Sequence, residues 1–220
     1  MLSPTIELLS KDMIMPATLV RPKTVTRLGP ESNGMRLTSR QYDRAEFEPG
    51  WRYELVNGVL IVSSPPLENE RDPNDELGRF LRNFQDGHED GHHLDMTLPE
   101  HEIIVGDDRR RADRAIWCGL GRLPRRGETP TIAVEFVSQG RRNWVRDYET
   151  KRDEYLAIGI REYWIINRFD RTLTVWTRTA SGRRKRVVRE SQTYHTDLLP
   201  GFELPLKRLL ELATRWADDL

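Results

Sequence analysis

Two acidic residues and one lysine in this chain have the types and setting needed for metal-assisted hydrolysis. Asp113 lies in a short apolar segment that is predicted to be a strand, and Glu135 interrupts the otherwise apolar run 131–137. An ionised carboxylate in a buried strand is costly unless it is paired or binds a metal. If the two strands are neighbours, both carboxylates could hold Mg²⁺ or Mn²⁺, with the Phe136 carbonyl as a third oxygen ligand. Lys151 follows in the next predicted helix.

Such a site would suit the hydrolysis of a phosphodiester. A bound divalent ion polarises the phosphate and activates water, and Lys151 could orient that water or stabilise developing charge. Asp147, Lys151 and Tyr155 are spaced four residues apart, so they share one helix face. Arg141 and Arg142 lie in the loop after the Glu135 strand, where they would suit phosphate contacts.

A structural explanation of the same residues is also open. Glu135 could pair with an arginine such as Arg114, and Arg111 or Arg114 could neutralise Asp113. Lys151 alone could be an ordinary solvated helix residue. The apolar setting of Glu135 favours a functional role, and the three residues together favour a site.

These residues must be positioned by a parallel strand–helix–strand unit. The strand 131–137, a helix over 146–158 and the strand 162–167 have the lengths of such a unit. An Asn57-Gly58 pair between 51–56 and 59–62 predicts a β-hairpin. Further strands are predicted over 94–98, 102–106, 112–117, 172–177 and 186–190. Further helices are predicted from an N-cap at Thr38 or Ser39 to residue 47, over 75–84 and over 206–216. A polar loop is predicted over 63–74. Residues 1–37 are predicted to be a weakly ordered arm and 38–220 a single domain.

Composition narrows the function classes. The chain has 220 residues, with 35 Lys+Arg and 35 Asp+Glu, so bulk binding of polyanions is not indicated and nucleic-acid contacts must come from local patches. Cys118 is the single cysteine, which excludes an internal disulfide and a cysteine-cluster zinc site. The sequence has no secretory signal pattern and no apolar run of membrane-spanning length. We therefore expect a cytoplasmic protein that does not bind membranes, and a homodimer through an exposed sheet edge is compatible with the chain.

Two other patterns compete with this interpretation. His88-Glu89-Asp90-Gly91-His92 matches the H-E-x-x-H signature of zinc proteases, but that chemistry needs both histidines on a stable helix. Gly87 and Gly91 bracket and interrupt the segment, so we interpret it as a polar turn. The basic clusters 109–111, 125–126 and 183–186 would favour phosphate binding only if they lie beside the cleft.

The chain resembles the Uma2 (DUF820-like) family within the PD-(D/E)XK nuclease superfamily, over roughly 38–210. The matching stretches are Tyr53–Gly58, Pro65-Pro66, Ala112–Ile116, Ala133–Ser138, Asp147–Tyr155, Glu162–Ile166 and Leu199–Phe202. This resemblance implies a restriction-endonuclease-like α/β (α+β) fold, a mixed sheet flanked by helices, that cleaves DNA with Mg²⁺. Its catalytic set corresponds to Asp113, Glu135 and Lys151, with Glu54 and Tyr155 in support.

This chain also differs from the family and superfamily patterns at several positions. The superfamily lysine usually stands two residues after the second acid, where this chain has Val137, and the Uma2 pattern moves it to the Lys151 helix. Family members often have a histidine where Glu70 or Asn74 falls, and an aspartate where Asn167 stands. These differences motivate a second hypothesis, a catalytically inactive nuclease-fold module that binds DNA or a protein partner.

Overall fold

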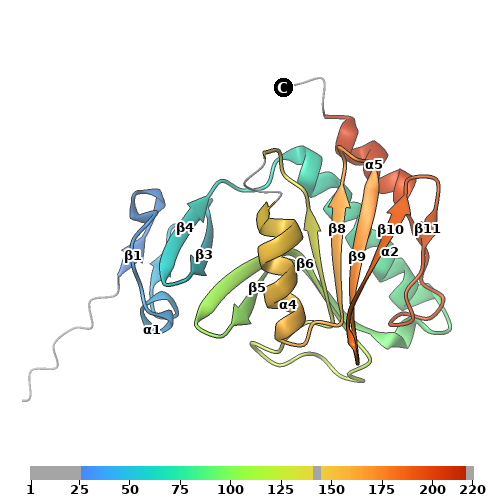
Figure 1. Cartoon of the computed structure of the whole chain (residues 1–220), viewed down its shortest axis with the longest axis horizontal. Coiled ribbons are helices and arrows are strands. Elements are labelled where there is room, and N and C mark those ends of the chain that lie inside the picture. The colour runs from blue at the N-terminus through green and yellow to red at the C-terminus, as the bar shows by residue number, and fades with distance from the viewer. Residues whose placement is uncertain (1–25, 141–144, 217–220) are drawn as a thin grey trace, which may run out of the picture.

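A mixed eight-stranded sheet organises the molecule. The computed structural model describes residues 26–140 and 145–216. Its elements are β1 Arg27–Leu28, η1 Pro30–Ser32, α1 Ser39–Tyr42, β2 Glu46–Phe47, β3 Arg52–Val56, β4 Val59–Ser63, α2 Glu68–Gly87, η2 Gly91–His93, β5 Leu94–Val105, β6 Asp108–Cys118, β7 Ile132–Phe136, η3 Arg146–Thr150, α4 Lys151–Ala157, β8 Glu162–Asn167, β9 Thr172–Thr179, β10 Gly182–Arg189, β11 Thr193–Tyr194, β12 Leu204–Pro205 and α5 Leu206–Thr214. The sheet order is β10-β9-β8-β7-β6-β3-β4, with β5 paired to β6 (Figure 1). The predicted mixed sheet flanked by helices is therefore confirmed.

Strand β6 changes its partner along one edge, and this change opens the gap in which the candidate residues gather. Arg114 pairs with Pro99 of β5 and Val134 of β7, whereas Arg109 pairs with Ile104 of β5 and Leu55 of β3. Strands β7 and β3 therefore follow one another along the edge of β6 that faces away from β5. Between them, residues 110–113 of β6 lack a continuous strand partner on that edge.

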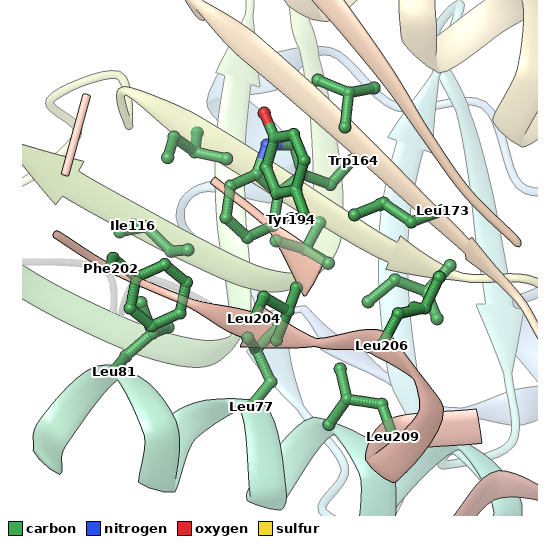
Figure 2. Close-up of a cluster of buried hydrophobic side chains, with 14 of the residues drawn as sticks. Leu77, Leu81, Ile116, Trp164, Leu173, Tyr194, Phe202, Leu204, Leu206 and Leu209 are labelled. Atoms are coloured by element: carbon green, nitrogen blue, oxygen red, sulfur yellow. The ribbon is translucent and has the colours of Figure 1, made fainter. Parts of the chain in front are cut away.

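Helices on both faces bury the sheet. On one face, Leu77 and Leu81 of α2 pack with Leu206 and Leu209 of α5 against Trp164 of β8, in the cluster that Figure 2 shows. Each fully buried leucine contributes about 1.5–3 kcal/mol of transfer free energy. On the other face, α4 packs its Tyr155 against Ala133, Tyr163 and Ile165. Alternation along β7 and the residue after it therefore sends Ala133, Glu135 and Val137 toward α4.

The strand–helix–strand prediction is confirmed, because β7 and β8 pair in parallel with α4 between them in sequence. The hairpin prediction is confirmed as well. β3 and β4 pair antiparallel, and Asn57 and Gly58 have φ of 52° and 71°, the positive values that a two-residue hairpin turn requires.

Several element predictions were wrong in their bounds, including β6, which begins at Asp108 rather than 112, and β10, which begins at Gly182 rather than 186. Helix α2 starts at Glu68 rather than 75, because packing against α5 outweighs the helix-breaking tendency of Pro73. Strands predicted over 94–98 and 102–106 are one strand, β5, which tolerates Pro99 because β6 lies on one side only. The helix capped by Thr38 stops at Tyr42 instead of 47.

The described part of the predicted weakly ordered arm is folded onto the hairpin. Leu28 of β1 is fully buried with Tyr42, Tyr53 and Leu60, and β1 pairs in parallel with β2. Residues 26–37 thus differ from the prediction, while residues 1–25 lie outside the described part. Among the described helices, none is long and apolar enough to span a membrane.

Candidate active site

Asp113 and Glu135 lie opposite each other on the two adjacent strands β6 and β7. The pairing of Arg114 with Val134, continued by one residue, brings the two acids face to face. Asp113 is 5% exposed and Glu135 is 2% exposed. Asp113 Oδ2 accepts a hydrogen bond of 2.7 Å from the backbone N–H of Phe136, a donor at the end of β7. The two acids are therefore fixed beside the gap in the sheet.

Lys151 reaches this gap from the first turn of α4. Its Nζ donates to Glu135 Oε1 at 2.9 Å and to the Arg111 carbonyl at 2.8 Å, and it lies 3.6 Å from Glu54 Oε1. Glu54 Oε1 in turn accepts the Arg111 N–H at 2.8 Å. No strand of the described chain pairs with the backbone of Arg111 on this edge of β6. Its N–H therefore bonds to Glu54 and its carbonyl to Lys151.

The remaining predicted helix residues also lie against the sheet. Tyr155 is fully buried, and its hydroxyl lies 3.4 Å from Glu135 Oε1. Asp147 is 1% exposed and bonds to Arg146 at 3.0 Å. It lies in η3, a turn of wide π-helix that joins directly onto α4. Such turns often occur at functional sites, and here the turn keeps Asp147, Lys151 and Tyr155 on one buried face.

These side chains line a small polar pocket. The residues that line it include Arg52, Glu54, Asp113, Glu135, Phe136, Arg146 and Lys151. The centre of a water molecule can move within a volume of about 20 Å³ in this pocket. That is room for about one water molecule or ion. A hollow of about 480 Å³ adjoins it at the carboxyl ends of β7 and β8 and shares Ser138 as a wall. This edge of parallel strands is where ligands usually bind in open sheets.

Burial and charge pairing act in opposite directions on the ionisable groups. Burial raises the pKa of Glu135 well above its usual range, and the positive charge of Lys151 offsets only part of this rise. Burial alone would lower the pKa of Lys151, but Glu135 and Glu54 outweigh it and raise that pKa. Since a bound cation favours ionised carboxylate, its arrival would lower the pKa of Glu135.

Three charged residues at the site were missed from the sequence. Arg52 bridges two acids, with its Nε 2.8 Å from Glu100 Oε2 and a terminal nitrogen 2.9 Å from Asp113 Oδ1. Arg146 lines the pocket beside Asp147. The sequence gives little indication of a role for Glu100, because an acidic residue that follows a proline in a predicted turn is typical of a solvent-exposed loop. Arg52 precedes the matched Tyr53-Glu54 stretch and could have been found there.

Several predicted alternatives are wrong. Arg114 does not pair with Glu135, because it turns to the α2 side and bonds to Asn74 and Thr97. The zinc-protease alternative is excluded as well, because α2 ends at Gly87 and the H-E-x-x-H segment is a turn followed by the short 3-10 helix Gly91–His93, as its interpretation as a polar turn predicted. In the described chain, ligand atoms from the side chains of three His, Cys, Asp or Glu residues lie within 4.8 Å of one another only at Asp90, His92 and His93, a group separate from the pocket.

The basic residues differ in their placement. Arg109 and Arg110 of β6 are buried in ion pairs with Asp43 and Glu154, so these two do not form an open phosphate-binding surface. The cluster 183–186 lies on the exposed edge strand β10, four strands along the sheet order from β6. Arg141 and Arg142 lie outside the described residues.

Comparison with known proteins agrees with this architecture. The Uma2 family, described as "Putative restriction endonuclease", matches residues 39–207. Among solved structures, the chain is similar to "a putative nuclease belonging to DUF820" from Anabaena variabilis ATCC 29413, with 12% sequence identity and a TM-score of 0.61 over 80% of this chain and 99% of that one. At that identity the likeness shows the fold alone. No curated protein matches the chain. Because the family match covers well over half of the residues, the chain belongs to the Uma2 family and has its nuclease fold.

Proposed function

We propose that this protein is a divalent-metal-dependent endonuclease that hydrolyses DNA phosphodiester bonds. The observation that carries the proposal is the opposition of Asp113 and Glu135 across β6 and β7, with Lys151 Nζ 2.9 Å from Glu135. Burying two carboxylates and a lysine costs desolvation free energy, so such a group is weak evidence of a purely stabilising role. Groups whose pKa is shifted by burial and by neighbouring charges cluster at functional sites. Membership of the Uma2 family supports a nuclease.

The donor set fits a hard cation. Asp113 and Glu135 offer carboxylate oxygens, Phe136 adds a backbone carbonyl at the pocket wall, and Mg²⁺ or Mn²⁺ prefers such oxygens. The contacts of Glu135 with Lys151 and Tyr155 are both made by Oε1, so Oε2 can accept a cation while Oε1 keeps Lys151. When bound, the ion supplies polarisation of the phosphate and a more acidic water.

The chain's own residues complete the arrangement. Lys151 holds a positive charge at the pocket wall, where it can orient a water or stabilise negative charge on the phosphate. Glu54 fixes the Arg111 N–H and helps keep Lys151 protonated. Tyr155 limits the rotation of Glu135 through its hydroxyl. Arg141 and Arg142 would contact flanking phosphates, as the sequence suggests.

A plasmid-nicking assay tests the proposal. Supercoiled DNA is incubated with the wild type, Asp113→Asn or Glu135→Gln in Mg²⁺ and in Mn²⁺. Each substitution should lower the nicking rate by at least about 100-fold, since removing one electrostatic group from an active site costs about 10²–10³. Glu149→Gln, at an exposed position of η3, should nick like the wild type. Equal nicking by all four proteins would reject the site.

A second function, a binding module without turnover, is favoured by one observation. Arg52 and Lys151 already pair with Asp113 and Glu135, so each acid has a positively charged partner without any ion. This alternative predicts that the wild type binds a DNA duplex with the same affinity in Mg²⁺ and in EDTA and leaves the plasmid intact in both.

A further inference from the structure

Three acids lie in a row across three neighbouring strands. Asp113 of β6 faces Glu135 of β7, and it also faces Glu100 of β5, because the pairs Pro99–Arg114 and His101–Ala112 flank that position. Like charges placed directly opposite each other destabilise a sheet. Arg52 separates two of them, with one nitrogen on Asp113 and its Nε on Glu100. One guanidinium therefore serves both carboxylates.

Glu100, which makes one of these contacts, has an unusual backbone conformation. Its φ is +50° inside a strand, a value that residues other than glycine rarely adopt and that persists where surrounding contacts enforce it. The Glu100 carbonyl accepts a hydrogen bond from Arg111. Its Oε1 is buried without a hydrogen-bond partner among the described residues, and burial raises the Glu100 pKa to about 7. This strained, incompletely satisfied carboxylate holds Arg52 beside the pocket.

The row does not itself form one three-carboxylate cation site. The ligand oxygens of Glu100, Asp113 and Glu135 do not all lie within 4.8 Å in the described chain, and the Arg52 side chain lies between two of them. The two contacts of Arg52 also differ in setting. Asp113 is 7% exposed at its side chain and faces Glu135, whereas Glu100 is 29% exposed and lies on the far side of Asp113.

We propose that Arg52 binds a phosphate of the DNA next to the scissile bond, and that Glu100 is the residue that positions it. When Asp113 binds a cation, the positive charge of that cation replaces the charge that Arg52 supplies, so the Asp113–Arg52 pair weakens. The contact of Nε with Glu100 stays, and the terminal nitrogens then face the pocket that Arg52 already lines. A guanidinium matches the geometry of phosphate oxygens. This inference rests on the proposed nuclease function.

Arg52 thus competes with the cation for Asp113 and also binds DNA. Removing its charge should therefore strengthen metal binding and weaken DNA binding. A structural counter-ion predicts the opposite for the metal, because its loss would loosen the strands that carry Asp113. The two effects together separate the roles.

Full-length wild type, Arg52→Gln, Arg52→Lys, Glu100→Gln and the control Arg79→Gln are compared. Arg79 pairs with Glu76 on the exposed side of α2. Titration calorimetry measures Mn²⁺ affinity without DNA, and fluorescence anisotropy in Ca²⁺ measures affinity for a 20-bp duplex. Arg52→Gln should bind Mn²⁺ at least about 3-fold more tightly and DNA about 10-fold more weakly, with Arg52→Lys intermediate. Glu100→Gln should weaken DNA binding and leave Mn²⁺ binding no weaker than in the wild type.

Two results would overturn the role of Arg52. One is DNA affinity in Arg52→Gln equal to that in Arg79→Gln, and the other is weaker Mn²⁺ binding in Arg52→Gln. Thermal melting of each variant checks that it is folded. Plasmid nicking by the wild type is measured separately. If the wild type binds Mn²⁺ and DNA but does not nick, the nuclease proposal fails while the binding data still decide the role of Arg52.

Discussion

Replacing Lys151 by methionine tests the buried ion pair that holds the site together. The ammonium is 2% exposed and bonds to Glu135 and to the Arg111 carbonyl, and methionine keeps the length but removes both bonds. Removing one member of a buried pair costs about 3–5 kcal/mol. For a domain of this size, that corresponds to a Tm about 6–20 °C lower.

The loss should also depend on pH. Burial raises the pKa of Glu135 well above its usual range even beside Lys151, and removal of the positive charge raises that pKa further, so the folded variant keeps a proton that the unfolded chain releases. The stability of Lys151→Met should therefore fall as pH rises through the folded pKa, and its deficit relative to the wild type should be larger at pH 8 than at pH 5.5.

Urea unfolding in EDTA at both pH values measures this effect, with the double variant Lys151→Met/Glu135→Gln as the matched comparison. The double variant should recover part of the lost stability, because position 135 then carries no buried charge that has lost its partner. A Lys151→Met deficit below about 1 kcal/mol at pH 8, or one that does not change with pH, would refute the buried pair.

Two further predictions concern the core around the site. Gly78→Ala should lower the free energy of unfolding by about 1–3 kcal/mol, because its methyl group would lie 2.6 Å from the buried and hydrogen-bonded guanidinium of Arg114. Gly87→Ala has open space around it and should be neutral or stabilising in the same urea unfolding experiment. Equal losses of stability in the two variants would contradict this packing. Burial raises the pKa of Cys118 to about 12, so a thiol reagent at pH 8 should label it only after unfolding, and rapid labelling of the native protein would show that the strand end is open.

The strand–helix–strand unit was predictable because its signals are local. The apolar run around Glu135 and the helix face of Lys151 and Tyr155 are set by periodicity within single elements, and the structure keeps that arrangement. The hairpin at Asn57-Gly58 was predictable for the same reason, since two backbone positions fix it.

The partners of the acids were not predictable, because they come from strand register between distant segments. Nothing near Asp113 in sequence indicates that Arg52 and Glu100 meet it, since β3, β5 and β6 must first pair. The neighbouring Arg111 and Arg114 were the local candidates for neutralising it. Arg114 instead points to the opposite side of the strand, and Arg111 bonds through its backbone and to a carbonyl. Helix α2 was shortened in the prediction because the penalty of Pro73 is local and the packing that overcomes it is not.

The proposed function requires that Asp113 and Glu135 bind the catalytic cation. A crystal of the full-length protein soaked in Mn²⁺, with anomalous scattering recorded, tests it most directly. We expect an anomalous peak in contact with both carboxylates and with the Phe136 carbonyl, and the loss of this peak in Asp113→Asn. A peak found only at Asp90, His92 and His93, the other group of possible ligands in the described chain, would contradict it.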